Sequence, residues 1–362
     1  MMSVFIPAAR PIIGEEERAA VDRVLQSGMM AQGPEVAAFE NEFSSIVANR
    51  PCIAVNSGTS GLHMALIAAG IKQGDEVIVP SFTFAATANT VALTGATPVF
   101  VDIDPKTFNI DPLAIEAAVT PRTRAIQPVH LYGQPAAMNE IMAIAERHNL
   151  LVIEDAAQAH MASLSGTPVG SFGTAGVFSF YPTKNMTSGE GGMISAASDE
   201  IARQCRLLRN QGMEKRYANE IVGFNTRMTD IHAAIGRVQL TKLESWTRQR
   251  RSNAKFLNEN LRDVVIPYVA PNAIHVYHQY TIRILGHSRD AFADEMNKRG
   301  VGNGVYYPTP VHELDSFRIK LDLRETTRAS KEVLSIPVHP SLSPRELETI
   351  VSVINSIASA GA

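Results

Sequence analysis

The chain has 362 residues, of which 45% are hydrophobic and 19% charged, so it can bury a large core and form one large domain plus a smaller one. Lys and Arg number 33 against 36 Asp and Glu, and a formal net charge of -3 provides no basic excess for binding nucleic-acid phosphates. Only two cysteines are present, which argues against a disulfide framework or a thiolate metal site and favours a reducing compartment.

The first residues do not have the pattern of a secretion signal. Arg10 and Pro11 interrupt the early apolar stretch, and three glutamates follow at 15–17. The most apolar region, 82–101, is broken by polar residues, glycine and proline, whereas a membrane span needs roughly 20 mostly apolar residues. We therefore expect a cytoplasmic protein without a transmembrane helix.

Short β-rich segments alternate with helical patterns from about residue 35 to 200, which is typical of a mostly parallel sheet between helices. A first helix is predicted from Pro34, since proline suits a first helical turn and apolar residues from Val36 to Ile46 recur at helical spacing. Strands are expected at 52–55, 76–79, 98–101, 125–129, 150–154, 176–180 and 192–196. The predicted fold class is therefore α/β with a seven-stranded sheet.

After residue 225 the pattern changes. A long helix is expected over 229–260 as a bridge between domains. A strand-like stretch at 277–284, a helix at 288–300 and a terminal helix from Pro344 follow. We divide the chain into a large domain, residues 1–245, and a smaller C-terminal α/β domain, residues 246–362, with the N-terminal segment as a candidate to pack on the small domain.

The segment NSGTSG at 56–61 joins an apolar strand to a helical pattern. Glycine lets the backbone approach a ligand, amides at a helix N-terminus attract anions, and Ser57, Thr59 and Ser60 add hydroxyl donors. The segment fits a phosphate site, and a plain strand-to-helix turn with a serine cap would give the same pattern.

Two further segments carry candidate chemical groups. VIEDAAQAH at 152–160 places Asp155 at the end of a strand, where open α/β sheets bind ligands, with a structural cap as the alternative. FSFYPTKNMTSGEGGMI at 178–194 places Lys184 in a polar turn, where burial or a nearby cation would make it a nucleophile, with a solvated loop lysine as the alternative. Together, a phosphate cradle, a strand-end carboxylate and a turn lysine are the parts needed to hold pyridoxal phosphate.

Ordered motifs along nearly the whole chain resemble the DegT/StrS-type sugar aminotransferases, which are fold-type-I pyridoxal phosphate enzymes. The motifs are PSFTFAATANT at 80–90, PVFVDIDPKTFNIDP at 98–112, PVHLYGQP at 128–135, EDAAQAH at 154–160, SFYPTKNMTSGEGG at 179–192, GFNTRMTDIHAAIGRVQL at 223–240 and YYPTPVH at 306–312. Such an ordered set is highly specific.

The resemblance implies roles for individual residues. Lys184 would form the Schiff base with the cofactor and move the proton, and Asp155 would pair with the pyridine nitrogen. Phe84 would stack on the cofactor ring, and Gln158 would lie near its phenolic oxygen. The phosphate would be bound by Gly58, Thr59, Ser60 and Ser179. Asn225 would reach the phosphate from a partner subunit, which implies a homodimer with shared active sites.

Weaker candidates for substrate contact lie in motifs that line the substrate side in the family. These are His130, Tyr132, Tyr307 and His312. Arg209 and Asn210 could meet a polar substrate, whereas we assign no catalytic role to His160. His275 and His278, three residues apart, resemble half of a metal site, but no clustered Cys, Asp or Glu accompanies them and no metal is expected.

The resemblance implies transamination in two half-reactions and a place in polysaccharide biosynthesis. An amino acid, with L-glutamate favoured, would convert the cofactor to pyridoxamine phosphate, and a nucleotide-linked keto sugar would then receive the amine. The TSGEGG run after Lys184 is more similar to family members that aminate carbon 4 than to those that aminate carbon 3.

Three alternatives remain to be weighed. A pyridoxal phosphate-dependent keto-deoxysugar dehydratase would have histidine in place of Lys184. A non-catalytic regulator that binds pyridoxal phosphate could dispense with Lys184 and Asp155. A dinucleotide-dependent oxidoreductase is disfavoured, because the glycines at 170–176 and 300–304 miss the G-x-G-x-x-G spacing.

Overall fold

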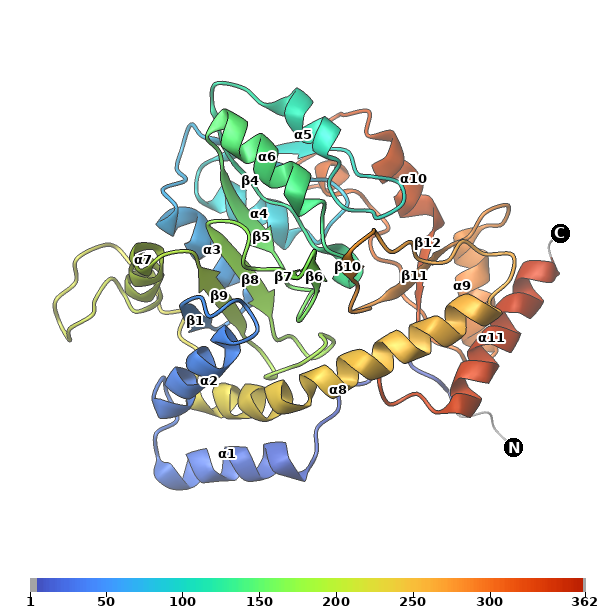
Figure 1. Cartoon of the computed structure of the whole chain (residues 1–362), viewed down its shortest axis with the longest axis horizontal. Helices are drawn as coiled ribbons and strands as arrows, with labels where there is room; N and C mark the ends of the chain where they lie inside the picture. Colours follow the sequence, from blue (N-terminus) through green and yellow to red (C-terminus); the bar gives the residue numbers. More distant parts are fainter. Residues whose placement is uncertain (1–4, 361–362) are drawn as a thin grey trace.

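A seven-stranded sheet forms the centre of the molecule, with strand order β1-β9-β8-β5-β4-β2-β3. The computed structural model describes residues 5–360 (Figure 1). The strands are β1 (Cys52–Val55), β2 (Glu76–Pro80), β3 (Thr97–Val101), β4 (Thr123–Ile126), β5 (Leu151–Asp155), β8 (Ala175–Ser179) and β9 (Gly192–Ala196). All neighbours are parallel except β9, which runs antiparallel to β1 and β8. The predicted α/β class and mostly parallel sheet are confirmed.

The strand that differs most from its predicted range is β4. It ends at Ile126 rather than at Val129. Pro128 follows two residues later and has no N–H to donate to a neighbouring strand, so regular pairing stops and only an isolated bridge joins Val129 to Asp155.

Both faces of the sheet are covered by helices, which is why its strands consist almost entirely of apolar residues. Along β1, Ile53 and Val55 belong to the core shared with α3 (Gly58–Ala68), α4 (Ala86–Leu93) and α7 (Asp199–Arg209). Cys52 and Ala54 alternate with them and face the opposite core, which contains α2 (Pro34–Ser44) and the start of α8 (Asp230–Asn260). Helices α5 (Pro112–Ala118) and α6 (Met138–His148) cover the rest of that second face.

The first helix of the structure, α1 (Glu15–Ser27), is not predicted by the sequence, where its glutamates serve only as evidence against a secretion signal. The helix is mostly polar and packs along α8 (Figure 1). Its one buried carboxylate, Glu17, accepts hydrogen bonds from Gln239 (2.7 Å) and Lys242 (2.8 Å) of α8. These contacts span more than two hundred residues, so no local pattern reveals them.

The C-terminal part has its own core, built from β11 (Tyr280–Arg283), β12 (Val333–Ile336), α9 (Arg289–Lys298), α11 (Pro344–Ser359) and the end of α8. Ile6 joins this core, and its backbone pairs with Val301. Because α8 is one continuous helix of 31 residues, the predicted domain boundary at 245/246 falls inside it. The remaining elements are β6 (Ser163–Leu164), β7 (Thr167–Pro168), β10 (Ala273–Ile274), η1 (Leu131–Gly133), η2 (Val311–Glu313) and α10 (Arg324–Glu332).

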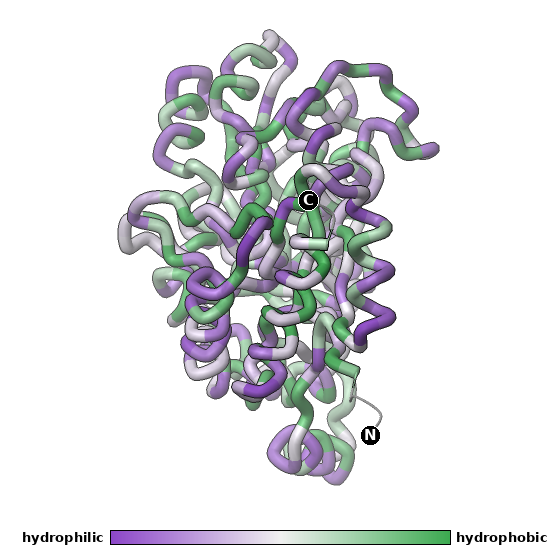
Figure 2. The backbone as a smooth tube through the Cα atoms, turned by 90° about the vertical axis from the view of Figure 1, so that its right-hand side faces the viewer, coloured by the Kyte–Doolittle hydropathy of each residue, from purple (hydrophilic) through white to green (hydrophobic). Residues whose placement is uncertain are grey.

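Hydrophobic segments run through the interior, and hydrophilic residues lie along the outer turns of the peripheral helices (Figure 2). Within residues 5–360, none of the helices combines the length and the apolar character needed to cross a membrane.

Candidate active site

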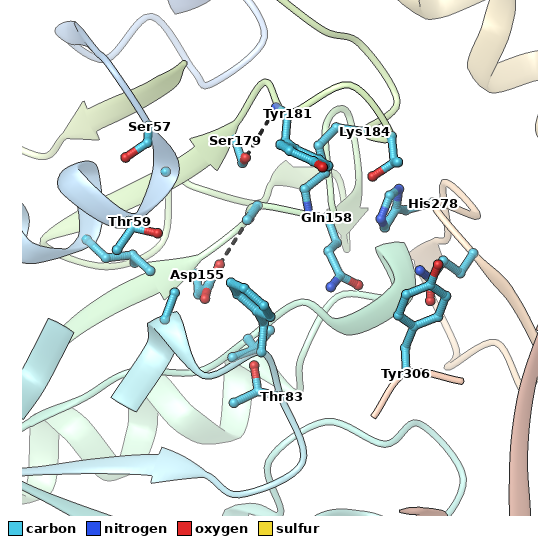
Figure 3. Close-up of a pocket in the computed structure, with 18 of the residues that line it drawn as sticks. Ser57, Thr59, Thr83, Asp155, Gln158, Ser179, Tyr181, Lys184, His278 and Tyr306 are labelled. Atoms are coloured by element: carbon cyan, nitrogen blue, oxygen red, sulfur yellow. Dashed lines mark hydrogen bonds between the residues drawn. The ribbon is translucent and has the colours of Figure 1, made fainter. Parts of the chain in front are cut away.

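A cavity of about 700 Å³ opens at the carboxyl-end edge of the parallel strands, and Figure 3 shows the side chains that line it. Its wall comes from the start of α3, the loop before α4, the end of β5, the loop after β8 and two segments of the C-terminal part, 278–279 and 306–307. This edge of an open α/β sheet is where ligands bind, and the volume suits a cofactor together with a small substrate.

Most of the residues proposed from the sequence meet in this cavity. The lining includes Gly58, Thr59, Phe84, Asp155, Gln158, Ser179, Lys184 and Tyr307. Ser60 lies just behind it, where its amide donates to Ser57 Oγ at 3.1 Å. Asn225 is exposed and does not line the cavity of its own chain.

Three predicted substrate residues, His130, Tyr132 and His312, do not line the cavity. His130 is fully buried, and its Nδ1 accepts the amide of Ala136 (3.0 Å), so Nε2 carries the proton and donates to Glu154 (3.1 Å). The ring of His312 is buried against the Ser81 hydroxyl. The Tyr132 hydroxyl donates to the carbonyl of Tyr306. Structural hydrogen bonds therefore account for the three side chains.

Arg209 and Asn210 also lie away from the cavity. Arg209 is buried, where it pairs with Glu40 and donates to the carbonyl of Ala54 (2.8 Å). Asn210 donates to the carbonyl of Met213 (3.0 Å). The polar-substrate role considered for these two residues has no support in their surroundings.

The N-terminus of α3 forms an anion-binding corner. The helix begins at Gly58, and Ser57 caps it. A Cβ at Gly58 would lie 2.9 Å from the Cβ of Ser179, so only glycine allows α3 to approach β8 this closely. The first turn, with Thr59 at the cavity, presents backbone amides and hydroxyls to a phosphate group.

Asp155 and its neighbour Glu154 face opposite sides of the sheet, because successive strand residues alternate. Asp155 lines the cavity and accepts hydrogen bonds from Thr87 Oγ1 (2.9 Å) and the amide of Ala157 (3.2 Å). Burial raises the pKa of Asp155, and these bonds and the charge of Lys184 oppose that rise without cancelling it.

Lys184 is the cation of the cavity lining. Burial lowers the pKa of its amine to about 8, although the attraction of Asp155 acts in the opposite direction. At neutral pH about one molecule in ten then carries the free amine, compared with fewer than about one in a thousand for an ordinary lysine. The position therefore provides a nucleophile that can also accept and return a proton.

Comparison with known proteins identifies the family to which the chain belongs. Residues 11–355 match the DegT/DnrJ/EryC1/StrS aminotransferase family. The chain belongs to this family. It is 43% identical to a "pleiotropic regulatory protein" of Geobacillus stearothermophilus, over 92% of each chain. It is 39% identical to GDP-perosamine synthase of Caulobacter vibrioides, over 97% of this chain and 98% of that enzyme.

A solved structure supports the same assignment. DesV of S. venezuelae, in complex with a ketimine intermediate, is 38% identical and superposes with a TM-score of 0.91, covering 95% of this chain and 94% of the DesV chain. The predicted resemblance and fold are confirmed, and the chain is a sugar aminotransferase.

The cavity of this aminotransferase fits pyridoxal phosphate. The α3 corner offers donors to the phosphate, Asp155 offers a carboxylate to a protonated pyridine nitrogen, and Lys184 offers an amine. Phe84 is 58% exposed at the cavity, which leaves a flat apolar surface for a ring. No group of three or more His, Cys, Asp or Glu side chains suited to a metal ion occurs within residues 5–360.

Sequence reasoning missed two residues of this site. Thr87, in the first turn of α4, donates to Asp155 (2.9 Å), and its hydroxyl lies 3.0 Å from that of Thr83. Local sequence gives no signal for this contact, because it depends on how α4 packs against the end of β5. His278 lines the cavity beside Lys184, although its sequence pattern suggested only half a metal site. No local signal places residue 278 there, because the contact depends on how the C-terminal part packs on the sheet.

Proposed function

We propose that the protein is a pyridoxal phosphate-dependent enzyme that moves an amino group from an amino acid, L-glutamate, to a nucleotide-linked keto sugar. The observation that carries this proposal is the meeting of Lys184 and Asp155 in one cavity, beside the N-terminus of α3. When bound there, the cofactor supplies an electron-withdrawing ring that lets a proton leave the carbon bearing the amine.

Each lining residue then has a defined task. Lys184 would hold the cofactor aldehyde and would accept and return the substrate proton at Nζ, because its lowered pKa of about 8 leaves free amine available. Asp155 would hold a positive charge on the cofactor's ring nitrogen. Gln158 is fixed in orientation, since Oε1 accepts the amide of Tyr132 (2.7 Å) and Nε2 donates to the hydroxyl of Tyr307 (3.0 Å), and its second amide proton is available to the cofactor's phenolic oxygen.

The nucleotide-sugar substrate is supported by the relatives, since one is named GDP-perosamine synthase. The TSGEGG run at 187–192 favours amination at carbon 4. Glu190 of this run lines the cavity, so the run is in position to influence the pose of the sugar.

A homodimer with shared sites is part of the proposal. Asn225 is exposed at the end of the loop 211–225, which projects from the body of the molecule after α7 (Figure 1). The loop exposes 81% of Tyr217 and 92% of Val222, and apolar surface of this kind is suited to contact with another chain. In such a dimer, Asn225 would reach the phosphate of the cofactor bound in the partner subunit.

The relative from Geobacillus stearothermophilus carries a regulatory name, but a non-catalytic regulator would need neither Lys184 nor Asp155. The presence of both Lys184 and Asp155 in the cavity favours catalysis over binding alone. Lys184 also disfavours a dehydratase, which would have histidine at this position.

Spectroscopy of the purified protein separates these functions. We expect a yellow protein that loses its absorbance on addition of L-glutamate. Borohydride should fix the cofactor irreversibly on Lys184 and remove the yellow colour, whereas Lys184→Ala should show neither fixation nor turnover. Lys255→Ala is the matched control, since that side chain is 78% exposed. A regulator would bind the cofactor but keep its colour with every amino acid offered. Mixing the bleached form with a panel of nucleotide keto sugars then identifies the acceptor, because only the correct sugar restores the colour.

A further inference from the structure

The segment 275–279 is anchored by hydrogen bonds on two sides, and its residues His278 and Gln279 line the cavity. The amide of Val276 donates to the carbonyl of Gly133 (3.0 Å), and the side chain of Asn185, next to the site lysine, donates to the carbonyl of Val276 (3.1 Å). The segment is therefore attached both to η1 and to the loop that carries the lysine, so its side chains are held in place before any ligand arrives.

His278 projects from this segment into the cavity with an incomplete set of hydrogen bonds. Its side chain is 8% exposed and lines the cavity together with Lys184 (Figure 3). Nδ1 is buried and has no partner among residues 5–360. The nearby His275, by contrast, uses Nδ1 to accept the amide of Tyr277 (2.9 Å). Because Nδ1 is sealed, Nε2 is the nitrogen of His278 that can meet a ligand in the cavity, and within residues 5–360 it has no hydrogen-bond partner either.

The charges around this ring are positive. Arg250 lies behind it with 6% exposure, and its Nη1 donates to the carbonyls of Tyr277 (3.1 Å) and His278 (3.4 Å). No carboxylate of the described residues pairs with Arg250, and its pKa, lowered by burial to about 10, leaves it charged at neutral pH. Lys184 is the second cation. The carboxylates at the cavity are Asp155, which attracts Lys184, and Glu190.

The imidazole itself stays neutral. Burial and the charges of Lys184, Arg250 and His160 hold the pKa of His278 well below its usual value. A neutral ring has one lone pair and one N–H. A lone pair on the sealed Nδ1 is favoured by the neighbouring cations, which leaves the N–H on the other nitrogen. The ring then offers a hydrogen-bond donor in a positively charged corner, and such a corner selects an anionic oxygen.

We propose that His278 is a specificity-determining residue that binds the α-carboxylate of the amino-acid donor, with the buried guanidinium of Arg250 supporting it from behind. The inference rests on the proposed function, because it assumes that an amino acid enters this cavity. The α-carboxylate is the fitting anion, since it is attached to the carbon whose proton Lys184 must reach, and His278 and Lys184 lie on the same side of the cavity (Figure 3).

A comparison of two amines tests the proposal in the holoenzyme. L-Glutamate carries the α-carboxylate, and 4-aminobutanoate is the same molecule without it. In stopped-flow bleaching of the yellow form, His278→Leu should lower kcat/KM for L-glutamate by about 10- to 100-fold, the value of a charged hydrogen bond, and leave the slower reaction of 4-aminobutanoate within about threefold. His278→Gln places an N–H donor near the lost one and should recover most of the discrimination.

Binding of an unreactive probe gives a readout independent of turnover. Glutarate, titrated calorimetrically into the protein, should bind about 10-fold or more weakly to His278→Leu than to the wild type or to His278→Gln. His275→Leu is the control, since it removes a buried imidazole from the same segment outside the cavity, and its ratio between the two amines should stay at the wild-type value.

The outcomes are distinct. If L-glutamate fails to bleach the wild type, the proposed function itself is wrong. If the wild type is bleached and His278→Leu and His278→Gln, both folded and loaded, keep the wild-type discrimination and glutarate affinity, the assignment of His278 is overturned.

Discussion

Glu154 holds the end of β5 from the side opposite the cavity, and replacing it by glutamine tests that role. Its Oε1 accepts the amides of Phe172 (2.8 Å) and Gly173 (2.9 Å). Its Oε2 accepts the amide of Gly170 (2.7 Å) and the Nε2–H of His130 (3.1 Å). Burial alone would raise the pKa of Glu154, but the bonds from His130, Gly173 and Gly170 lower it, so the carboxylate is ionised and all four donors are satisfied.

In Glu154→Gln the side chain keeps one oxygen, and its NH₂ group faces two of the four donors. Each orphaned buried donor costs about 1–3 kcal/mol, so the free energy of unfolding should fall by about 2–6 kcal/mol. Urea unfolding of the cofactor-free protein at pH 7 measures this loss. Glu146→Gln, at an exposed position of α6, should change the free energy by less than about 0.5 kcal/mol.

The result also decides the role of His130, which the sequence placed on the substrate side. If Glu154→Gln loses less than about 1 kcal/mol of stability while the KM for the sugar rises, the pair serves the substrate and the structural interpretation is refuted.

Two further predictions concern the ionisable pair of the cavity. Thr87→Val removes the hydroxyl 2.9 Å from Asp155, so the pKa of that carboxyl should rise further. Cofactor affinity, measured by equilibrium dialysis, should fall about 10- to 100-fold, with Thr87→Ser close to wild type. Equal affinity in both variants would show that Thr87 does not act on the carboxylate. The pKa of Lys184 is about 8 in the folded protein and 10.5 for an ordinary lysine. Between pH 8 and 10.5 the unfolded chain therefore binds more protons than the folded protein does. Stability of the cofactor-free protein should therefore rise by up to about 3 kcal/mol from pH 8 to 10.5 relative to Lys184→Met, and parallel pH curves would contradict the buried ammonium.

Local signals allowed much of the fold to be predicted. Strand ranges follow from apolar runs buried on both faces, and the starts of α2 and α11 follow from Pro34 and Pro344. Helix α1 escaped prediction because its burial depends on α8, through the bonds that Glu17 receives. Periodicity reports only which face of an element is apolar, and a short polar helix held by distant side chains has almost no such signal.

The candidate site could be predicted only in part for a related reason. Lys184 and Asp155 are recognisable because they follow apolar strands, and strand ends meet at one edge of the sheet. Membership of a motif does not reveal which way a side chain faces. His130 and His312 belong to motifs of the substrate side, but their side chains are buried and make structural hydrogen bonds. For His278 the sequence shows only a histidine three residues after His275. Its place in the cavity lining could not be predicted, because it depends on how the C-terminal part packs on the sheet.

The reactivity of this cavity comes from burial acting in opposite directions on two charges. Removal from water disfavours an ammonium and a carboxylate alike, so it lowers the pKa of Lys184 and raises that of Asp155, and both move toward neutral pH. The wall that excludes water includes segments 278–279 and 306–307, and the bond from Gln158 to Tyr307 ties the second of them to the end of β5. A substitution that weakens the packing of these segments would admit water and return the pKa of Lys184 toward its ordinary value. The cavity would then lose its free amine although Lys184 itself is unchanged.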